Sequence, residues 1–316
     1  MKDIIINGQF HVQARVGKGG QSVAYSGLTI LLSASESLLL TDSGTDLFSN
    51  QKVAIKLTGE VHADQARDEE EIYISIAGGT GIPNVKWFGH QGPYSIIVLD
   101  LLGPSLDDLH RYCGGKFSLK TVLMIADQAL YRLQHIHSKG YLHRDVKPAN
   151  LLMGCGKKGN VVYLIDYALA VNISGIERRE QPRGVAWAGT PDFASLTCHN
   201  RYGQSWGDDL ESLLYSLVFL ATGTLPWYDV PCPSDAQLDE QTKLMKMRPP
   251  ESICEGLPRQ FARFLTIVRG LRYGEKPNYT HLRRMFNLLF VERGFKHDFV
   301  FDWTEKLYNE TIKGNS

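Results

Sequence analysis

Short runs of apolar and β-branched residues, separated by Gly, Asn and Ser, fill most of the first hundred positions. This pattern is typical of β-strands joined by turns. It predicts strands at residues 4–10, 12–16, 23–32, 53–57, 85–90 and 94–102. Residues 62–76 are charged at first, then apolar, and end at Gly78-Gly79, which predicts a helix. Residues 26–51 are interpreted as an extended hairpin.

Beyond residue 105 the apolar positions recur at spacings of three and four, which is the period of a helix packed on one face. A long helix is expected between an N-cap at Ser118 and a stop at Gly140. Further helices are expected at residues 208–221, 258–271 and 279–290. Gly103-Pro104 is the expected boundary. The pattern predicts an α+β protein with a small β-rich lobe, carrying one main helix, and a larger α-helical lobe.

The chain has 316 residues, and its 34 Lys and Arg balance its 34 Asp and Glu. Such a balance produces no overall field that attracts nucleic acid or an anionic membrane. The five cysteines form no C-x-x-C pair, which argues against a disulfide framework or a zinc site. The longest apolar run, residues 213–221, is far shorter than the ~18 residues that cross a bilayer. We expect a monomer in the cytoplasm, with the nucleus as a further location, and no nucleic-acid or membrane partner.

A glycine-rich stretch, Gly17-Lys18-Gly19-Gly20-Gln21-Ser22, lies between two predicted strands. Glycine has no Cβ, so backbone N–H groups in such a loop can approach phosphate oxygens closely. A glycine-rich turn is nevertheless more often only a turn, and Ser22 interrupts the pattern G-x-G-x-x-G. The loop is a phosphate site only if other residues support it.

Lys56 is a single charged residue inside the apolar run 53–57. A lysine in a half-buried strand usually extends its amine to solvent, and the alternative is that it is held inward to bind an anion. Glu69 of the predicted helix could pair with it. The pair would fix the ammonium for nucleotide phosphates before the nucleotide binds.

The strongest local signal is the run Leu142-His143-Arg144-Asp145-Val146-Lys147-Pro148-Ala149-Asn150. Asp145 could accept a hydroxyl proton, Lys147 could neutralise a transferring phosphoryl group, and Asn150 could bind Mg²⁺. Asp166 ends an apolar run sixteen residues later and could present a second metal-binding carboxylate. A solvated loop carboxylate is the alternative for Asp145, but the spacing H-R-D-x-K-x-x-N matches the catalytic loop of protein kinases.

On these residues the chain resembles eukaryotic protein kinases, and more narrowly the casein kinase 1 family, from about Val12 to Trp303. Seven further motifs are similar to that family: Gly81-Ile82-Pro83, Leu102-Gly103-Pro104-Ser105-Leu106, Phe117-Ser118-Leu119-Lys120-Thr121-Val122, His137-Ser138-Lys139, Gly156-Lys157-Lys158-Gly159-Asn160, Asp208-Asp209-Leu210-Glu211-Ser212 and Val300-Phe301-Asp302-Trp303. The resemblance implies a bilobal protein kinase fold, with residues 1–99 as N-lobe, 100–104 as hinge and 105–316 as C-lobe. It also implies transfer of the γ-phosphoryl group of ATP, with Mg²⁺ as cofactor, to Ser or Thr hydroxyls of protein substrates.

The resemblance assigns a role to each charged residue of these motifs. Lys56 would contact the α- and β-phosphates and pair with Glu69. Asp145 would be the catalytic base and Lys147 a contact to the γ-phosphate. The Mg²⁺ ligands would be Asn150 and Asp166. Asp209 would hold the backbone of the catalytic loop.

Nucleotide binding is implied for a second set of residues: Val16, Gly17, Gly19, Ala24, Ala54, Lys56, Leu99, Asp100, Leu102 and Leu152. Of these, Leu99 takes the gatekeeper position. Residues 100–102 correspond to the hinge, whose backbone groups would bind adenine.

Four departures from the family pattern affect the expected activity. Ser22 and Gln21 change the glycine-rich loop, and Ala168 replaces a glycine after Asp166-Tyr167. An Ala disfavours positive φ, so a catalytically impaired scaffold that binds nucleotide or a partner is the alternative to an active kinase. Asp192 and Pro231 replace the family's cationic substrate contacts, which predicts a weakened preference for acidic or pre-phosphorylated substrates.

Overall fold

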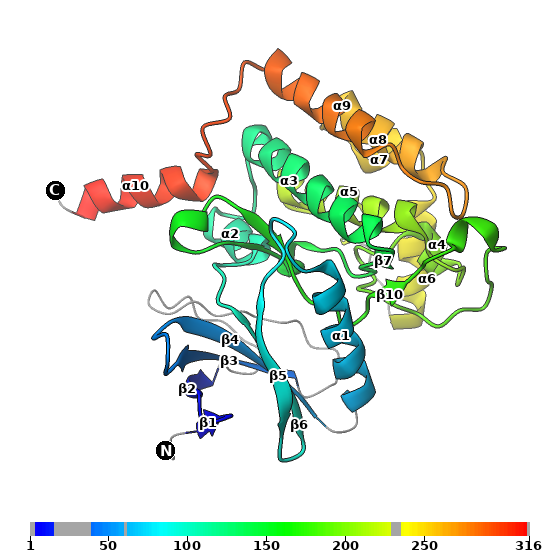
Figure 1. Ribbon diagram of the computed structural model, residues 1–316. Coiled ribbons are helices and arrows are strands. Elements are labelled where there is room, and N and C mark those ends of the chain that lie inside the picture. The colour runs from blue at the N-terminus through cyan, green and yellow to red at the C-terminus, as the bar shows by residue number, and fades with distance from the viewer. Residues whose placement is uncertain (1–3, 16–38, 60–61, 229–234, 315–316) are drawn as a thin grey trace. The chain divides into compact units, whose positions relative to one another are not determined.

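The computed structural model describes residues 4–15, 39–59, 62–228 and 235–314 (Figure 1). The chain divides into two compact units. The first unit comprises Met1–Leu106 and Ala149–Ala168, and the second comprises Asp107–Pro148 and Leu169–Ser316. The strand expected at residues 23–32 lies outside the described residues. The helices of the described residues include none that could span a membrane by length and apolar character.

The first unit contains an antiparallel sheet in the order β1-β2-β3-β4-β6-β5. Its strands are β1 (Ile4–Ile6), β2 (Phe10–Arg15), β3 (Leu39–Asp46), β4 (Lys52–Gly59), β5 (Val85–Gln91) and β6 (Tyr94–Asp100). The strand expected at residues 4–10 is interrupted by a turn, in which Asn7 and Gly8 both have positive φ. Of the hairpin expected at residues 26–51, the described part is β3 and its turn into β4, and residues 26–38 lie outside the described residues.

One long helix of the first unit, α1 (Ala63–Ile76), packs against strands β4, β5 and β6 (Figure 1). Alternation along β4 separates its side chains into two sets. Val53 and Ile55 enter an apolar core with Ile96 and Val98 of β6. Lys56 belongs to the other set, and its ammonium contacts a residue of α1. Strand periodicity therefore turns a lysine inward within a mostly apolar strand.

A second small hairpin also belongs to the first unit, although the sequence-based division assigns residues 105–316 to one lobe. Its strands are β8 (Leu151–Met153) and β9 (Val162–Leu164). The backbone N–H of Gly103 donates to the carbonyl of Met153 at 2.6 Å, and Ser105 pairs with Leu152. These backbone contacts attach the segment Ala149–Ala168 to the end of the segment Met1–Leu106.

The second unit is mainly helical, with α3, α5 and α9 running side by side (Figure 1). Its helices are α2 (Leu106–Tyr112), α3 (Leu119–Ser138), α4 (Leu196–His199), α5 (Trp206–Thr222), α6 (Asp235–Lys246), α7 (Pro250–Ile253), α8 (Arg259–Arg269), α9 (Tyr279–Glu292) and α10 (Asp302–Gly314). Two short strands, β7 (Tyr141–Leu142) and β10 (Val171–Asn172), pair with each other. A short 3₁₀ turn of this unit spans Ile176–Arg178. Another, Gly156–Lys158, belongs to the first unit, and a third, Pro148–Asn150, lies where the chain passes from one unit to the other.

Helix boundaries in the second unit follow capping chemistry. The side chain of Ser118 accepts a hydrogen bond from the N–H of Thr121, which confirms the predicted N-cap of α3. The helix ends before Gly140, which has a φ of 83°. Helix α5 begins two residues before the expected position because Ser205 and Asp208 form a capping box around its first turn.

Candidate functional site

Lys56 is the centre of a buried ion-pair cluster in the first unit. Its ammonium lies 2.7 and 2.8 Å from the two carboxylate oxygens of Glu69 on α1. It also lies 2.9 Å from Oδ1 of Asp166, which follows β9. Lys56 is 4% exposed and Glu69 is 1% exposed. The structure therefore contains the expected pair between Lys56 and Glu69, and it adds Asp166 to the same ammonium.

The electrostatics of the cluster keep its lysine charged. Burial alone would lower the pKa of Lys56, but the carboxylates of Asp166 and Glu69 outweigh burial and raise its pKa above the ordinary value. One cation faces two carboxylates, so the cluster carries an excess of negative charge. An excess of negative charge in a partly buried site favours a bound cation.

Asn150 and Asp166, the two residues expected to bind a metal, are brought together by the β8–β9 hairpin. Leu151 pairs with Leu164, and the carbonyl of Asn150 accepts a hydrogen bond from the N–H of Ile165 at 3.0 Å. Asn150 precedes one strand and Asp166 follows the other, so antiparallel register places them at the same end of the hairpin. A carboxylate and an amide oxygen are suitable ligands for Mg²⁺.

The residues after Asp166 are fixed by contacts within the first unit. The hydroxyl of Tyr167 donates to the carbonyl of Leu164 at 3.0 Å, and its ring packs edge-on against Tyr73 of α1. Gln65 donates to the carbonyl of Ala168 at 3.0 Å. Positive φ occurs at Asp166, at 67°, and not at Ala168. The alanine is therefore compatible with this conformation, because the positive φ that an alanine disfavours occurs at Asp166.

Apolar residues expected to line an adenine site are also found in the first unit. Ala54 and Leu99 are direct partners on neighbouring strands. Leu102 and Leu152 belong to one buried cluster with Tyr163 and Ile165. The side chain of Asp100 pairs with Lys86 at 2.8 Å. The other expected nucleotide contacts, Val16, Gly17, Gly19 and Ala24, lie outside the described residues.

In the second unit, Asp145 and Lys147 converge on Thr190. The hydroxyl of Thr190 donates to Oδ1 of Asp145 at 2.7 Å, and its backbone N–H donates to the same oxygen at 3.0 Å. The ammonium of Lys147 lies 2.7 Å from the hydroxyl of Thr190 and 2.8 Å from Oδ2 of Asp145. The carboxylate of Asp145 is thus placed to accept a hydrogen bond from a hydroxyl group beside a cation.

Asp209 on α5 holds the segment that leads into Asp145. Its carboxylate accepts the backbone N–H groups of His143 and Arg144 at 2.8 Å each, and Nε2 of His137 lies 2.7 Å away. Burial alone would raise the pKa of Asp209, but the hydrogen bonds from His137 and these N–H groups lower its pKa below the ordinary value. An ionised, buried carboxylate therefore anchors a backbone in which Arg144 has a φ of 66°.

Gly189 and Thr190 were not identified as candidate residues from the sequence. Gly189 has a φ of 111°, and a Cβ at this position would lie 2.5 Å from the carbonyl oxygen of Arg144. Only glycine permits this approach, which brings Thr190 to Asp145. The only sequence signal is the pair Gly189-Thr190 itself. Its importance becomes clear only from the contact between Thr190 and Asp145, which are 45 residues apart.

Asp192, one of the two positions predicted to weaken binding of acidic substrates, is half-buried. Burial raises the pKa of its carboxyl group, although a hydrogen bond with Tyr228 acts in the opposite direction. Pro231, the other replaced position, lies outside the described residues.

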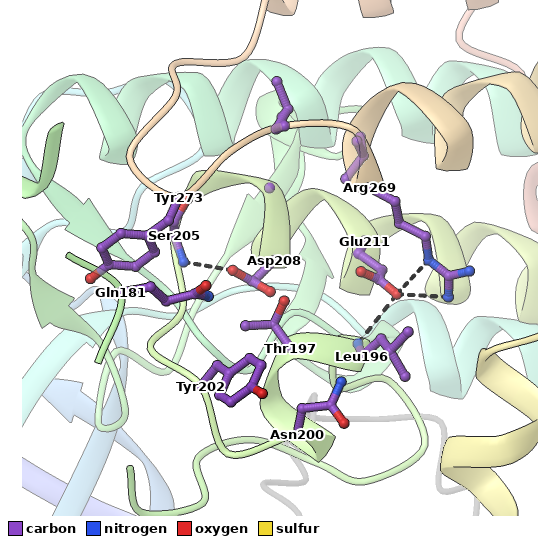
Figure 2. Close-up of a pocket in the computed structure, with 13 residues that line it drawn as sticks. Gln181, Leu196, Thr197, Asn200, Tyr202, Ser205, Asp208, Glu211, Arg269 and Tyr273 are labelled. Carbon is purple, nitrogen blue, oxygen red and sulfur yellow. Dashed lines mark hydrogen bonds and ion pairs between the residues drawn. The ribbon is translucent and has the colours of Figure 1, made fainter. Parts of the chain in front are cut away.

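A pocket of about 250 Å³ lies next to the first turn of α5 (Figure 2). Asp208 faces it, and burial raises the pKa of this carboxyl group to about 7. Glu211 on the wall accepts two hydrogen bonds from Arg269 at 2.9 and 3.1 Å. The pocket thus adjoins an ion pair that connects α5 to α8.

The family model described as "Protein kinase domain" matches residues 42–266, which is more than two thirds of the chain. The matched range contains the clusters around Lys56 and Asp145, together with the β8–β9 hairpin.

Proposed function

Since the chain belongs to the protein kinase family, whose domain transfers phosphoryl groups, we propose that it is an active, ATP- and Mg²⁺-dependent serine/threonine kinase resembling casein kinase 1. One observation carries this proposal. The ammonium of Lys56 lies within 3 Å of carboxylates from α1 and from the end of β9, in segments up to 110 residues apart. Lys56 and Glu69 are buried and Asp166 is partly buried. Burying charged side chains is costly, so a cluster of this kind points to a functional site.

The first unit would bind the nucleotide. The charged ammonium of Lys56 would contact its phosphates, and Asp166 with Asn150 would hold Mg²⁺, which supplies charge neutralisation. Ala54, Leu99 and Leu152 would contact the adenine ring. The buried residue Leu102 has a backbone N–H without a hydrogen-bond partner among the described residues, which suits a contact to the base.

The second unit would bind the acceptor and remove its proton. Asp145 would accept the proton of the attacking hydroxyl, as its contact with the Thr190 hydroxyl illustrates. Lys147 would stabilise the negative charge that develops during transfer. The hydroxyl of Thr190 contacts both Asp145 and Lys147. This geometry holds a small aliphatic hydroxyl group, which supports Ser or Thr as the acceptor.

The preference for acidic or pre-phosphorylated substrates would be weaker than in casein kinase 1. A phosphate beside Asp192 would meet a carboxyl group in place of the expected cation, so a pre-phosphorylated substrate would gain no charge-assisted hydrogen bond there. Paired peptides with and without an upstream phosphoserine should have kcat/KM values within about twofold of each other. A strong preference for the phosphopeptide would refute this part of the proposal.

The test of the proposed function is a phosphotransfer assay with Mg-ATP and a degenerate Ser/Thr peptide library. Wild type should phosphorylate Ser and Thr peptides. Asp145→Asn and Asp166→Asn should each reduce the rate by on the order of 10³-fold. Asp64→Asn, a change to an exposed carboxylate on α1, is the matched control and should keep the wild-type rate.

Calorimetric titration with Mg-ATP separates loss of chemistry from loss of nucleotide binding. Asp145→Asn should bind the nucleotide as wild type does, whereas Asp166→Asn should bind it more weakly. Transfer that is unchanged by Asp145→Asn would identify a contaminating kinase and favour the nucleotide-binding scaffold.

A further inference from the structure

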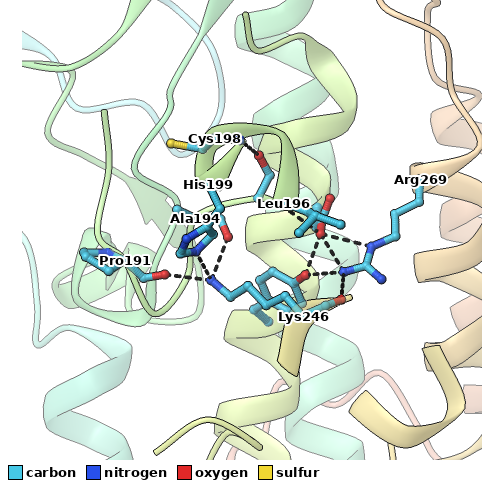
Figure 3. Close-up of polar contacts among 10 residues, drawn as sticks. Pro191, Ala194, Leu196, Cys198, His199, Lys246 and Arg269 are labelled. Atoms are coloured by element: carbon cyan, nitrogen blue, oxygen red, sulfur yellow. Dashed lines mark hydrogen bonds and ion pairs between the residues drawn. The ribbon is translucent and has the colours of Figure 1, made fainter. Parts of the chain in front are cut away.

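Lys246, the last residue of α6, is buried with 0% exposure in the second unit. Its ammonium donates hydrogen bonds to the carbonyl oxygens of Pro191 and Ala194 at 2.7 and 2.8 Å (Figure 3). These carbonyls belong to the loop that begins directly after Thr190. A side chain from α6 therefore holds the backbone that continues from the Asp145 contact.

The other groups in direct contact with the Lys246 ammonium are an imidazole that is neutral near pH 7 and two aromatic rings. Nε2 of His199 lies 3.0 Å away, and the rings of Tyr215 and Trp227 have their centroids at 5.0 and 4.8 Å. Within the described residues, no carboxylate lies within 4 Å of this ammonium. Carbonyl oxygens and aromatic faces are its main acceptors.

The backbone of Lys246 is fixed as firmly as its side chain. Its carbonyl accepts a hydrogen bond from Arg269 of α8 at 2.7 Å. Arg269 also pairs with Glu211, and Oε1 of Glu211 accepts the backbone N–H of Leu196 at 3.3 Å. Helices α4, α5, α6 and α8 are thus connected around the loop at residues 191–194 (Figure 3).

We propose that Lys246 is a positioning residue that fixes the loop at residues 191–194 for binding of the protein substrate. This inference rests on the proposed function. Lys246 is fully buried, so it acts through the loop and does not touch the acceptor. The loop follows Thr190, so its position determines where a peptide chain can lie when its hydroxyl reaches Asp145.

Protonation of Lys246 adds a pH dependence. Several titratable and charged groups face Lys246 from the surrounding elements: Asp192, Cys198, His199, Glu211, Tyr215, Asp239 and Arg269. Burial lowers the pKa of Lys246 to about 7, and the carboxylates of Glu211 and Asp192 offset burial only in part. Hydrogen bonds from an ammonium are stronger than those from a neutral amine, so the loop is held less firmly as the pH rises above 7.

His199 does not titrate in the same range. Burial and the charge of Lys246 lower the pKa of His199 to about 4, so its ring is neutral near pH 7. Its Nδ1 lies 3.0 Å from Oδ1 of Asp239, without an aligned hydrogen bond. The change in charge near neutral pH is therefore assigned to Lys246.

The test compares Lys246→Met, which removes the ammonium but keeps the apolar stem, with Lys243→Met on the same helix. At pH 6.5 the KM for a peptide substrate should rise about tenfold in Lys246→Met. The KM for ATP and kcat should stay within about twofold of wild type. In wild type the peptide KM should rise between pH 6.5 and 8.5, and this rise should be absent in Lys246→Met. Lys243→Met should match wild type throughout.

An unchanged peptide KM in Lys246→Met, or an equal loss in every kinetic constant, would overturn the proposal. A second measurement needs no activity: hydrogen exchange of amides 192–196 should be faster in Lys246→Met than in Lys243→Met. If wild type transfers no phosphate, the proposed function fails, and this exchange measurement still decides the positioning role. Equal exchange in the two variants would refute it.

Discussion

Two lysines with almost no solvent exposure, Lys56 in the first unit and Lys246 in the second, have pKa values shifted in opposite directions. Burial alone lowers the pKa of both. Lys56 contacts two carboxylates below 3 Å, and its pKa rises. Lys246 contacts carbonyl oxygens and aromatic rings, and its pKa falls to about 7. Burial does not decide the charge of a lysine, and the formal charge of its nearest acceptors does.

Because of these opposite pKa shifts, Lys56 stays charged at neutral pH, whereas Lys246 can lose its proton there. An ammonium that binds phosphates, the role proposed for Lys56, must stay charged over the whole physiological range, and the two carboxylates beside Lys56 raise its pKa. An ammonium that only holds a loop can lose its proton near neutral pH. The three predictions below test this distinction, beginning with the largest effect.

The largest effect is expected for Lys56→Met, because it leaves the buried Glu69 and the partly buried Asp166 without their cation. Breaking a buried charge cluster in this way costs about 3–5 kcal/mol. Phosphotransfer should also fall on the order of 10³-fold. Urea unfolding at pH 7 measures the first effect, and the peptide assay measures the second.

A second variant checks the origin of the lost stability. Lys56→Met combined with Glu69→Gln should recover part of the free energy of unfolding, because one uncompensated carboxylate is gone. It should recover no activity. If the double variant were less stable than Lys56→Met, the effect would come from lost packing and not from unpaired charge.

The contrast between the two lysines also shows what a sequence can predict. Lys56 could be identified because a single charge interrupts a strand, and strand alternation turns it toward a helix that carries Glu69. The catalytic-loop spacing likewise identified Asp145 and Asn150. The α+β kinase fold predicted from these motifs is confirmed by the family match and by the sheet and helices.

Lys246 could not be identified in the same way. It follows Lys243 in a polar helix, where a charged residue is normally exposed. Its burial depends on Trp227 and Tyr215, which lie on other segments, and on the loop at residues 191–194. Contacts between segments that are far apart in the chain leave no local pattern, which also explains why Gly189 was not identified.

The second prediction concerns the pH dependence of stability. The folded protein binds the Lys246 proton less tightly than the unfolded chain, whose lysine pKa is near 10.5. Between pH 7 and 10.5 the unfolded chain carries more protons, so the free energy of unfolding rises with pH. Relative to Lys246→Met, wild type should gain about 3 kcal/mol between pH 7 and 9.5.

Urea unfolding of both proteins at the two pH values measures this gain. Lys56 adds no slope in this window, because its pKa is raised and its contribution is lost only above pH 10.5. Lys243→Met serves as the control and should follow wild type. A constant difference between wild type and Lys246→Met across the window would show that Lys246 is charged throughout.

The smallest effect is expected for Asp208→Asn. This change tests how burial shifts the pKa of a carboxyl group that has no cation beside it among the described residues. Burial raises the pKa of Asp208 from 3.8 to about 7, so between these values the folded state binds more protons than the unfolded chain. Its contribution to the free energy of unfolding is therefore full below pH 3.8 and is lost as the pH rises to 7.

An asparagine at position 208 can still accept the N–H of Ser205, so the cap of α5 should survive the change. The pocket beside Asp208 is wide enough for water, which weakens the effect of burial. We therefore expect the free energy of unfolding to change by about 1–2 kcal/mol between pH 4.5 and 7 relative to the variant. Unfolding curves of Asp208→Asn and wild type should therefore approach each other at the acidic end and separate at pH 7, with the variant the more stable protein there. The exposed Asp64→Asn change should leave the pH profile as it is in wild type. Parallel profiles for Asp208→Asn and wild type would mean that Asp208 is ionised when folded, and that polar contacts can keep a buried carboxylate charged without a cation.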